Sequence, residues 1–453
     1  MKLILRPATA LLLFVSVLSS CKKEGINEFT QKSTASAQRG YQPLNPGFAE
    51  NNMVLYWNDK VATVLGVPMN QPTRSRYFAM VEIAVHDALN NIKPKFQRYS
   101  LKDRQQHADP DAAVASAAYW AIKGLHIEGT FPVDSWYSES LASLPEAESK
   151  EMGITLGKEA AASIISNRTN DGFTQVVQAS PFPADGTQPG VYRHTNLLDL
   201  RFVPNWGTVV KPYVLISNYQ FRPAGPNAVS SPEYAADYNE VKSKGARVGS
   251  SRTAEEEMLA RFWAEHRPSI IWNNVARAVI ANEKMDAWKT ARLFALMHTA
   301  IADGINTGLE AAYYFYSWRP ETAIHEGNND NNSATTADAS WIPFVIEAPS
   351  GNPAGTFVTP PIPEYPASYA MMGSSAAEII KSVIGKDAIN ITLNSFSLPG
   401  VPLQYTSLAQ AAKDNALGKI YAGWHFRKSV VDGDLAGRQV ADYIFTHSFQ
   451  SEE

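Results

Sequence analysis

Apolar residues recur at helical spacing along most of this chain, and no other sequence feature restricts the fold as much. Between residues 75 and 92, for example, Phe78, Val81, Val85 and Leu89 fall on one stripe of a helix. Alternation of apolar and polar residues, which marks a strand, is nearly absent. The pattern predicts an all-α protein in which the helices pack as bundles.

The predicted helices form two sets, separated by an irregular connector rich in proline and glycine at about 181–231. With 453 residues, of which 45% are hydrophobic, the chain can bury a large core. We therefore predict one helical domain over 46–453, made of two fused bundles at about 46–180 and 232–453. The connector links the bundles, helps to form a site, or does both. Helices beyond the one at 75–92 are predicted at 112–125, 135–144, 146–168, 254–266, 270–280, 286–318, 407–424 and 434–445.

The N-terminus has the pattern of an export signal. Lys2 and Arg6 precede an apolar run, and Leu-Ser-Ser-Cys at 18–21 resembles a bacterial lipobox, whose cysteine is lipidated after cleavage. A plain secretory signal with an incidental cysteine is the alternative. We predict a lipoprotein signal peptide over 1–20 and a lipid anchor on Cys21 that holds the protein in the bacterial cell envelope.

Residues 21–45 are polar and rich in Ser, Thr, Gln and Gly, so they are predicted to form a flexible tether. Cys21 is the only cysteine, which excludes disulfides and thiolate metal sites within a monomer. The most apolar later stretch, 293–316, carries three ionisable residues and reads as a buried core helix. Contact with a membrane is therefore predicted only through the lipid anchor.

The charge pattern argues against nucleic acid as a partner. The net charge is −4 and the two signs are interspersed, so no basic footprint is present. The expected partner is a small molecule.

A first candidate for binding such a molecule lies at 363–384. Two prolines hold Pro-Glu-Tyr-Pro extended, Ser368 is a suitable N-cap, and small and apolar residues follow at helical spacing. A helix N-terminus offers free backbone N–H groups and the positive end of a dipole, which together suit an oxyanion. An ordinary capped core helix would have the same pattern.

Two other segments strengthen the oxyanion interpretation. Arg319 ends an aromatic run at 313–320, and Lys419 and His425 lie among aromatic residues at 419–426. A desolvated anion site requires cationic or imidazole donors held in such surroundings. The alternative is that Arg319 and His425 are packing groups only.

Taken in chain order, Trp-Arg-Pro, Pro-Glu-Tyr-Pro before a small-residue helix, and Ile-Tyr-Ala-Gly-x-His-Phe resemble the vanadium-dependent haloperoxidase and type 2 phosphatidic acid phosphatase superfamily, in its haloperoxidase-like branch. The resemblance covers about 53–445. It implies a helical scaffold of two fused bundles and a site for vanadate or phosphate. The two activities use the same site, so the sequence does not separate a haloperoxidase from a phosphatase.

The resemblance assigns roles to particular residues. Arg319 stands at the first arginine of the site, Lys419 replaces the second arginine, and Ser368 stands at the oxyanion-binding glycine. His425 stands at the histidine that attacks phosphorus or ligates vanadate. Tyr369 occupies the position of the general acid histidine.

Other positions depart from the superfamily pattern. The lysine position is Ala312, the serine position is Ala367, and the aspartate that orients the covalent histidine is Ser429, with Asp432 close by. Each lost hydrogen bond to a charged group costs roughly 1.5–3 kcal/mol, so two lost donors lower oxyanion affinity by roughly 10²–10⁴. Loss of a general acid removes about another 10²–10⁴ in rate.

The site is therefore expected to be eroded. We expect a protein that binds a small anionic molecule, with vanadate as a possible cofactor and with weak or absent turnover. The alternatives are a purely non-catalytic binding protein and an active haloperoxidase or phosphatase in which His325 or Lys428 substitutes for the lost groups.

Three further motifs are assigned no function. His86 and Asp87 are adjacent within a helix, point about 100° apart, and are expected to belong to the framework. The loop at 325–332 lacks the alternating acids of an EF-hand. Pro-Ser-Gly at 349–351 is followed by Asn352 instead of histidine and is expected to be a loop.

Overall fold

Helix α12 (Ala287–Phe315) is a central element of the fold, because helices from both halves of the chain pack against it. In the computed structural model the described residues are 52–177, 185–194, 203–264, 267–345 and 359–452. They belong to one compact unit, Tyr41–Glu453. The predicted signal peptide, the tether, Cys21 and the loop at 349–351 lie outside the described residues. No described helix is long and apolar enough to cross a membrane.

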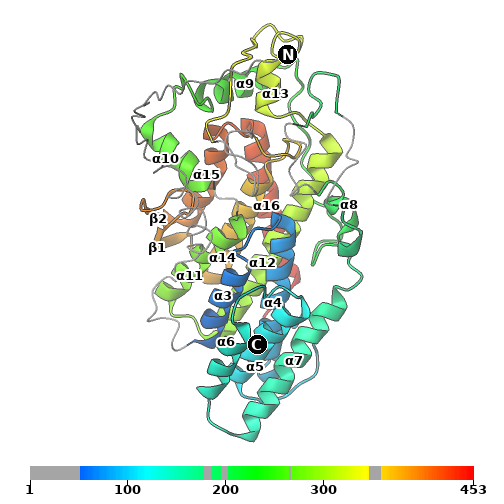
Figure 1. Ribbon diagram of the computed structural model, residues 1–453, viewed down its shortest axis with the longest axis vertical. Coiled ribbons are helices and arrows are strands. Elements are labelled where there is room, and N and C mark those ends of the chain that lie inside the picture. Colours follow the sequence, from blue (N-terminus) through cyan, green and yellow to red (C-terminus); the bar gives the residue numbers. More distant parts are fainter. Residues whose placement is uncertain (1–51, 178–184, 195–202, 265–266, 346–358, 453) are drawn as a thin grey trace, which may run out of the picture. The chain divides into compact units, whose positions relative to one another are not determined.

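The N-terminal half is helical, as predicted. Its helices are α3 (Met53–Val64), α4 (Gln71–Ile92), α5 (Pro110–Gly124), α6 (Val133–Ala142) and α7 (Glu148–Asn167). Helices α5 and α7 lie close together because Gly153 and Gly157 face the backbone of α5. Figure 1 shows α5, α6 and α7 grouped together, with α4 passing between them and α12.

A 3₁₀ turn, η1 (Phe173–Gln175), lies just before the connector. A short helix, α8 (Trp206–Val209), lies within it. The C-terminal half then forms the remaining helices: α9 (Pro232–Lys244), α10 (Ala254–Trp263), α11 (Pro268–Glu283), α13 (Pro320–His325), α14 (Ser368–Ile384), α15 (Leu408–Tyr421) and α16 (Arg427–His447). A capping box between Thr253 and Glu256 starts α10.

Several predicted boundaries were wrong. Helix α9 was not predicted, because its exposed polar residues hide the buried stripe that contains Tyr234 and Tyr238. Helix α16 starts at Arg427, seven positions before the predicted start at 434. Helix α15 ends at Tyr421, and Gly423 then adopts a φ of 85° that redirects the chain.

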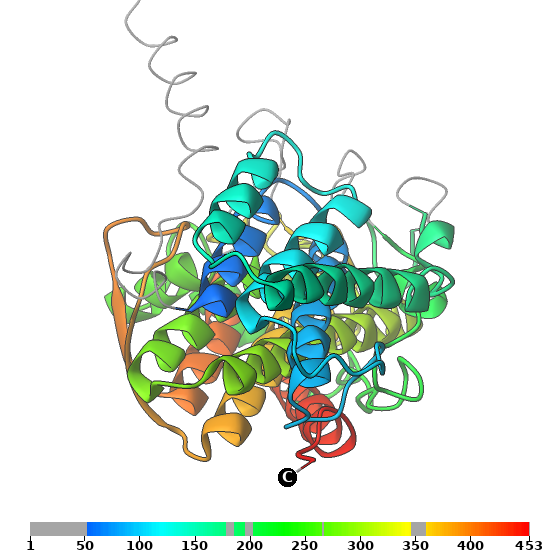
Figure 2. The same cartoon turned by 90° about the horizontal axis from the view of Figure 1, so that it is seen from below.

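One small sheet was also missed. Strands β1 (Ala388–Leu393) and β2 (Leu403–Ser407) pair antiparallel, with Ile391 opposite Tyr405. Figure 2 shows this hairpin at the edge of the unit. Its strands are short, so their alternation is weak in the sequence, but Ile391, Leu393 and Tyr405 are buried. The fold is otherwise helical over the described residues, as expected.

The core consists of two clusters. The larger cluster takes apolar residues from both halves, from Val54 to Phe449. The smaller cluster takes residues from α9, α10, α13, α14, α15 and α16 and from the adjoining loops, and it includes the aromatic residues Tyr238, Trp318, Trp341 and Trp424. This second cluster surrounds the ends of the elements that carry the candidate site.

Two buried aspartates fasten loops to the long helices. Asp87 of α4 accepts hydrogen bonds from the backbone N–H groups of residues 99–101, at 2.6–3.0 Å. Asp303 of α12 accepts them from the N–H groups of residues 213–215, at 2.6–3.1 Å. Each carboxylate satisfies three buried donors that no secondary structure would pair.

Candidate active site

Three chain segments bring the candidate residues together. Arg319 is the residue before α13, Glu364 lies in the loop before α14, and His425 lies between α15 and α16. The turn before His425 requires Gly423, because a Cβ atom there would lie 2.6 Å from the carbonyl oxygen of Gly245. The ends of three helices therefore meet within the smaller core cluster.

Arg319 and His425 are in direct contact. Arg319 Nη1 lies 3.1 Å from His425 Nε2 and donates to the carbonyl oxygen of Trp424 at 2.9 Å. Arg319 Nε donates to the carbonyl oxygen of Ile362 at 2.7 Å. A guanidinium group can only donate, so His425 Nε2 must accept. Both side chains are buried.

His425 is therefore neutral, and its ring proton is on Nδ1. Burial is the largest cause of this state, because it disfavours the charged imidazolium. The nearby charges of Arg319 and Lys419 act in the same direction, and the pKa of His425 is held well below its ordinary value.

Glu364 is a site residue that the sequence interpretation missed. His425 Nδ1 donates to Glu364 Oε1 at 3.0 Å, and the N–H of Phe426 donates to the same oxygen at 2.9 Å. The side chain is 1% exposed. Burial raises the pKa of Glu364 to about 8, although the charge of Arg319 acts in the opposite direction. The available signal is the acidic residue inside Pro-Glu-Tyr-Pro, a motif to which the sequence interpretation assigns only a structural role.

The two positions considered for an orienting aspartate behave differently. Ser429 Oγ lies 3.3 Å from His425 Nδ1 and donates to the backbone oxygen of Glu364 at 3.1 Å. Asp432 instead accepts hydrogen bonds from Tyr365 Oη and from Lys428 Nζ. Ser429 thus lies beside the imidazole, whereas the carboxylate of Asp432 pairs elsewhere.

Lys419 and Tyr369 form a second pair beside the first. Lys419 is buried, and its Nζ donates to the carbonyl oxygen of Trp263. The same Nζ lies 5.6 Å from the centre of the Tyr369 ring. Lys419 therefore brings positive charge close to His425, as its effect on the pKa of that histidine shows.

Ser368 is not the N-cap of α14. Ala367 holds that position and gives no side-chain cap, and Ser368 is the first helical residue. Its side chain packs on α12, since a Cβ atom added at Gly308 would lie 2.8 Å from Ser368 Cβ. Close packing of α12 and α14 explains the difference, because a serine buried against a glycine cannot turn back over the helix end.

A partly open cavity of about 60 Å³ lies beside two residues that contact His425 Nδ1. Glu364 and Ser429 line it, together with Lys428 and Asp237. Its remaining walls are Gly190, Pro226, Asn227, Val229, Tyr234, Ser317, Trp318, Tyr365 and Phe426. This volume exceeds the roughly 10–15 Å³ that a cavity needs to hold one water.

The connector forms part of this wall. Tyr192 N–H donates to the carbonyl oxygen of Tyr316 at 2.8 Å, and Trp318 N–H donates to that of Gly190 at 3.0 Å. A bridge also joins Val191 to Ser317. The connector is thus bonded to the segment that leads into Arg319.

The possible substitutes for the lost acid point elsewhere. His325 Nε2 donates to the carbonyl oxygen of Trp341 at 2.7 Å. Lys428 Nζ is paired with Asp432 at 2.6 Å. In the described structure, neither contacts His425 Nε2.

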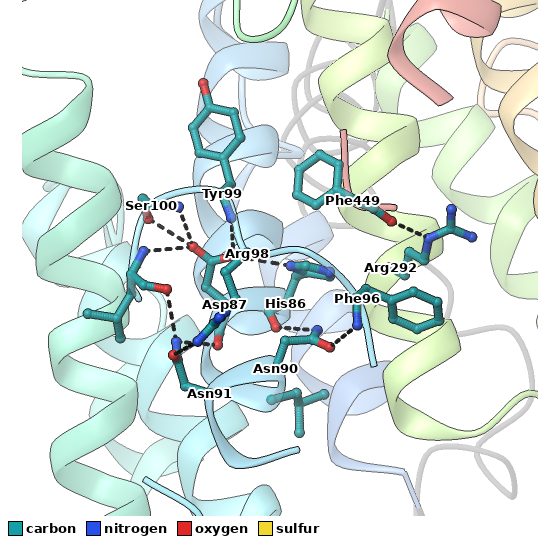
Figure 3. A network of polar contacts seen from close by, with 12 residues as sticks. His86, Asp87, Asn90, Asn91, Phe96, Arg98, Tyr99, Ser100, Arg292 and Phe449 are labelled. Atoms are coloured by element: carbon teal, nitrogen blue, oxygen red, sulfur yellow. Dashed lines mark hydrogen bonds and ion pairs between the residues drawn. The ribbon is translucent and has the colours of Figure 1, made fainter. Parts of the chain in front are cut away.

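His86 and Asp87 belong to the framework (Figure 3). Their side chains do touch, since His86 Nδ1 lies 3.2 Å from Asp87 Oδ1. Asp87, however, points at the loop of Tyr99 and Ser100 and accepts hydrogen bonds from both. His86 packs edge-on against Phe449 at 4.8 Å between ring centres.

Comparisons with known proteins bear on the family and the fold of the chain. Residues 292–451, which include Arg319, Glu364 and His425, match the family model described as the VCPO second helical-bundle domain. Over 403 residues the chain is 21% identical to vanadium chloroperoxidase from Curvularia inaequalis. That match covers 73% of this chain and 65% of the relative. These matches support membership of the vanadium-dependent haloperoxidase superfamily.

Solved structures from bacteria share the fold of this chain. One is titled as the first bacterial vanadium-dependent iodoperoxidase; it has a TM-score of 0.71 and 20% identity, and the match covers 88% of this chain and 98% of that one. An apo-type bacterial vanadium-dependent chloroperoxidase has a TM-score of 0.63 and 16% identity, with 84% and 94% covered.

The donor set fits a vanadate ion only in part. His425 supplies a neutral imidazole nitrogen, and Arg319 and Lys419 supply two cations. Ala312 and Ala367 bring no side-chain donor. Arg319 and Lys419 donate to carbonyl oxygens, and Arg319 also donates to His425. Within the described residues, no group of three or more His, Cys, Asp or Glu side chains could hold a metal cation.

Proposed function

We propose that this protein is an exported, lipid-anchored member of the superfamily that binds a small oxyanion weakly and turns over slowly or not at all. The observation that carries the proposal is the contact between Arg319 and His425 Nε2. The nitrogen that would attack phosphorus or ligate vanadate already accepts a hydrogen bond from the cation that would hold the anion.

An incoming oxyanion must compete with this internal pairing. Exchanging one hydrogen bond to a charged group involves roughly 1.5–3 kcal/mol, which is about 10–150-fold in affinity. The donors missing at 312 and 367 lower affinity further. Phosphate or vanadate is therefore expected to bind with a Kd on the order of millimolar.

Calorimetric titration with phosphate, and with vanadate as a second probe, tests this binding. Arg319→Ala should abolish the signal, because it removes a cation beside His425. Arg277→Ala is a matched control: Arg277 is also buried but contacts the carbonyl oxygen of Leu55 in another part of the core. Micromolar binding that persists in Arg319→Ala would place the site elsewhere.

Restoring the superfamily residues should raise turnover. Tyr369→His returns an acid that titrates near neutrality, and Ala312→Lys with Ala367→Ser returns two donors. Because these groups act on one transition state, the triple variant should exceed the product of the single effects. The assays are aryl phosphate hydrolysis, and bromide oxidation by peroxide with added vanadate.

His425→Ala in the triple variant is the control and should return turnover to the background. The expected wild-type rate is far below the roughly 10 per second that is typical of enzymes. If the wild type reaches that rate and His425→Ala abolishes it, the eroded-site proposal is wrong.

An active haloperoxidase or phosphatase with a substitute general acid is the second candidate. The pair of neutral His425 and Glu364 favours it, because the proton on Nδ1 leaves the lone pair on Nε2, where it could attack once the hydrogen bond from Arg319 is exchanged. Without a good acid, such an enzyme should prefer activated aryl esters to alkyl esters, since their leaving groups need no proton.

A further inference from the structure

A histidine that acts through Nε2 needs a fixed partner on Nδ1. The partner holds the ring orientation and keeps the proton on Nδ1, which leaves the Nε2 lone pair available. By the superfamily pattern this partner is an aspartate at position 429, where the present chain has Ser429. The serine hydroxyl lies 3.3 Å from Nδ1 and carries no charge.

Glu364 satisfies the same requirement from the loop before α14. One carboxyl oxygen accepts from both His425 Nδ1 and the N–H of Phe426, so ring and backbone are fixed by one atom. The Glu364 backbone is itself fixed at both polar groups. Its N–H donates to the carbonyl oxygen of Ser317 at 2.9 Å, and its carbonyl oxygen accepts from Ser429 Oγ.

We propose that Glu364 is the positioning residue of His425, and that the carboxyl function expected at position 429 on α16 has moved to the loop before α14. The effect on anion binding rests on the proposed function. The location of the proton on His425 does not rest on the proposed function, so the positioning role and the proposed function can be refuted separately.

The cavity provides room to return the carboxylate to position 429. Ser429 lines about 60 Å³ of space beside Glu364. Replacing serine by aspartate enlarges the side chain by less than the roughly 30 Å³ that one liquid water occupies. The cavity can therefore take up the added volume of an aspartate at 429, whose serine counterpart already lies 3.3 Å from Nδ1.

This geometry allows a carboxylate swap as a test. Glu364→Met keeps much of the buried volume but removes the acceptor. The double variant Glu364→Met with Ser429→Asp replaces the acceptor from the helix side. Glu364→Gln keeps an oxygen acceptor without the charge, and Glu82→Gln alters another buried carboxyl that does not contact His425.

The first readout is the ¹⁵N NMR spectrum of histidine-labelled protein, with the His425 signals assigned through His425→Ala. Wild type and Glu82→Gln should show the proton on Nδ1. Glu364→Met should lose this single tautomer, and both Glu364→Gln and the double variant should keep or regain it.

The second readout is phosphate affinity by calorimetry. Loss of such a partner typically lowers affinity by roughly 10–100-fold. The phosphate affinity of Glu364→Met should therefore fall by about that factor, and the double variant should regain the wild-type affinity. An unchanged tautomer in Glu364→Met would overturn the proposal, as would a folded double variant that lacks the Nδ1 proton. If Glu364→Met does not fold, the proposal is overturned by loss of the Nδ1 tautomer in Glu364→Gln.

If wild type shows the predicted tautomer but no phosphate binding, the proposed function fails and the positioning role of Glu364 stands.

Discussion

Glu82 and His298 are buried in a polar network that joins α3, α4, α11 and α12. Asn58 donates to Glu82 at 2.9 Å and to Asn273 at 2.9 Å. His298 Nε2 lies 2.9 Å from Asn273 Oδ1, and its ring stacks on that of Phe78. Burial raises the pKa of Glu82 to about 7 and lowers that of His298 to about 3.

These shifts predict opposite effects of pH on stability. Glu82 holds its proton in the folded state up to about pH 7, whereas an unfolded glutamate loses it near 4.5. Its contribution is therefore fully present below about pH 4.5 and is lost as the pH rises to 7, by roughly 1.4 kcal/mol per pH unit. For His298 the folded state binds less proton, so stability rises between about pH 3 and 6.5.

Glu82→Gln should remove the fall in stability between pH 4.5 and 7. Glutamine can still accept from Asn58 and does not titrate. Urea denaturation of wild type and variant at pH 5, 6 and 7 gives the difference in unfolding free energy, which cancels the contribution of His298. A difference that stays constant over this range would mean that Glu82 is ionised in the fold.

Sequence reasoning selected Arg319 and His425 because both lie within the motifs themselves. It could not identify Glu364 as the hydrogen-bond partner of His425, because that contact depends on how the loop before α14 folds onto the start of α16. It could not foresee that Arg319 would donate to His425, since cationic residues near a histidine suggest an anion between them. The Ser368 cap failed for the same reason: packing on Gly308 is tertiary.

At the scale of elements, the contact between α14 and α16 depends on small residues. A Cβ atom added at Gly437 would lie 2.2 Å from both Met371 O and Ser374 Oγ. Ser375 Oγ also donates to the carbonyl oxygen of Gly437 at 3.0 Å. Because α16 starts directly after His425, this contact helps to set the position of the imidazole.

Gly437→Ala should therefore destabilise the protein by about 1–3 kcal/mol through overpacking, even though alanine favours helices. Val431→Ala on the exposed face of the same helix is the control and should change stability much less; Val431 is 52% exposed. Thermal and urea unfolding measure both. A neutral or stabilising Gly437→Ala would show that the helices can separate freely.

Helix existence was predictable and helix ends were less so. Periodicity located α5, α7 and α12 within a few residues, because each buries a continuous stripe. The first turns of helix α16 were missed because half-buried charged residues, among them Arg427, Lys428 and Asp432, interrupt the apolar stripe there. The turn at Gly423 has no helical periodicity that the sequence could reveal, although this turn sets the position of His425.

At the scale of the whole molecule, the predicted anchor determines where the protein is found. Cys21 is the only possible thiol acceptor for a lipid, so Cys21→Ser should move the protein from the membrane to the soluble fraction. Cell fractionation measures this, with Lys23→Ala as a nearby control that keeps the cysteine. Membrane association that is unchanged in Cys21→Ser would exclude the lipoprotein prediction.

Asp87 and Asp303 each make one loop depend on one buried carboxylate. Asp87 lies in Ala-Val-His-Asp-Ala-Leu-Asn at 84–90, and Asp303 lies in Ala-Ile-Ala-Asp-Gly-Ile-Asn at 300–306. The two segments share Ala, Asp and Asn at equal spacing, and each aspartate binds three successive N–H groups. Each aspartate therefore holds one loop to its helix through a single side chain, so replacing it would leave three N–H groups without that acceptor.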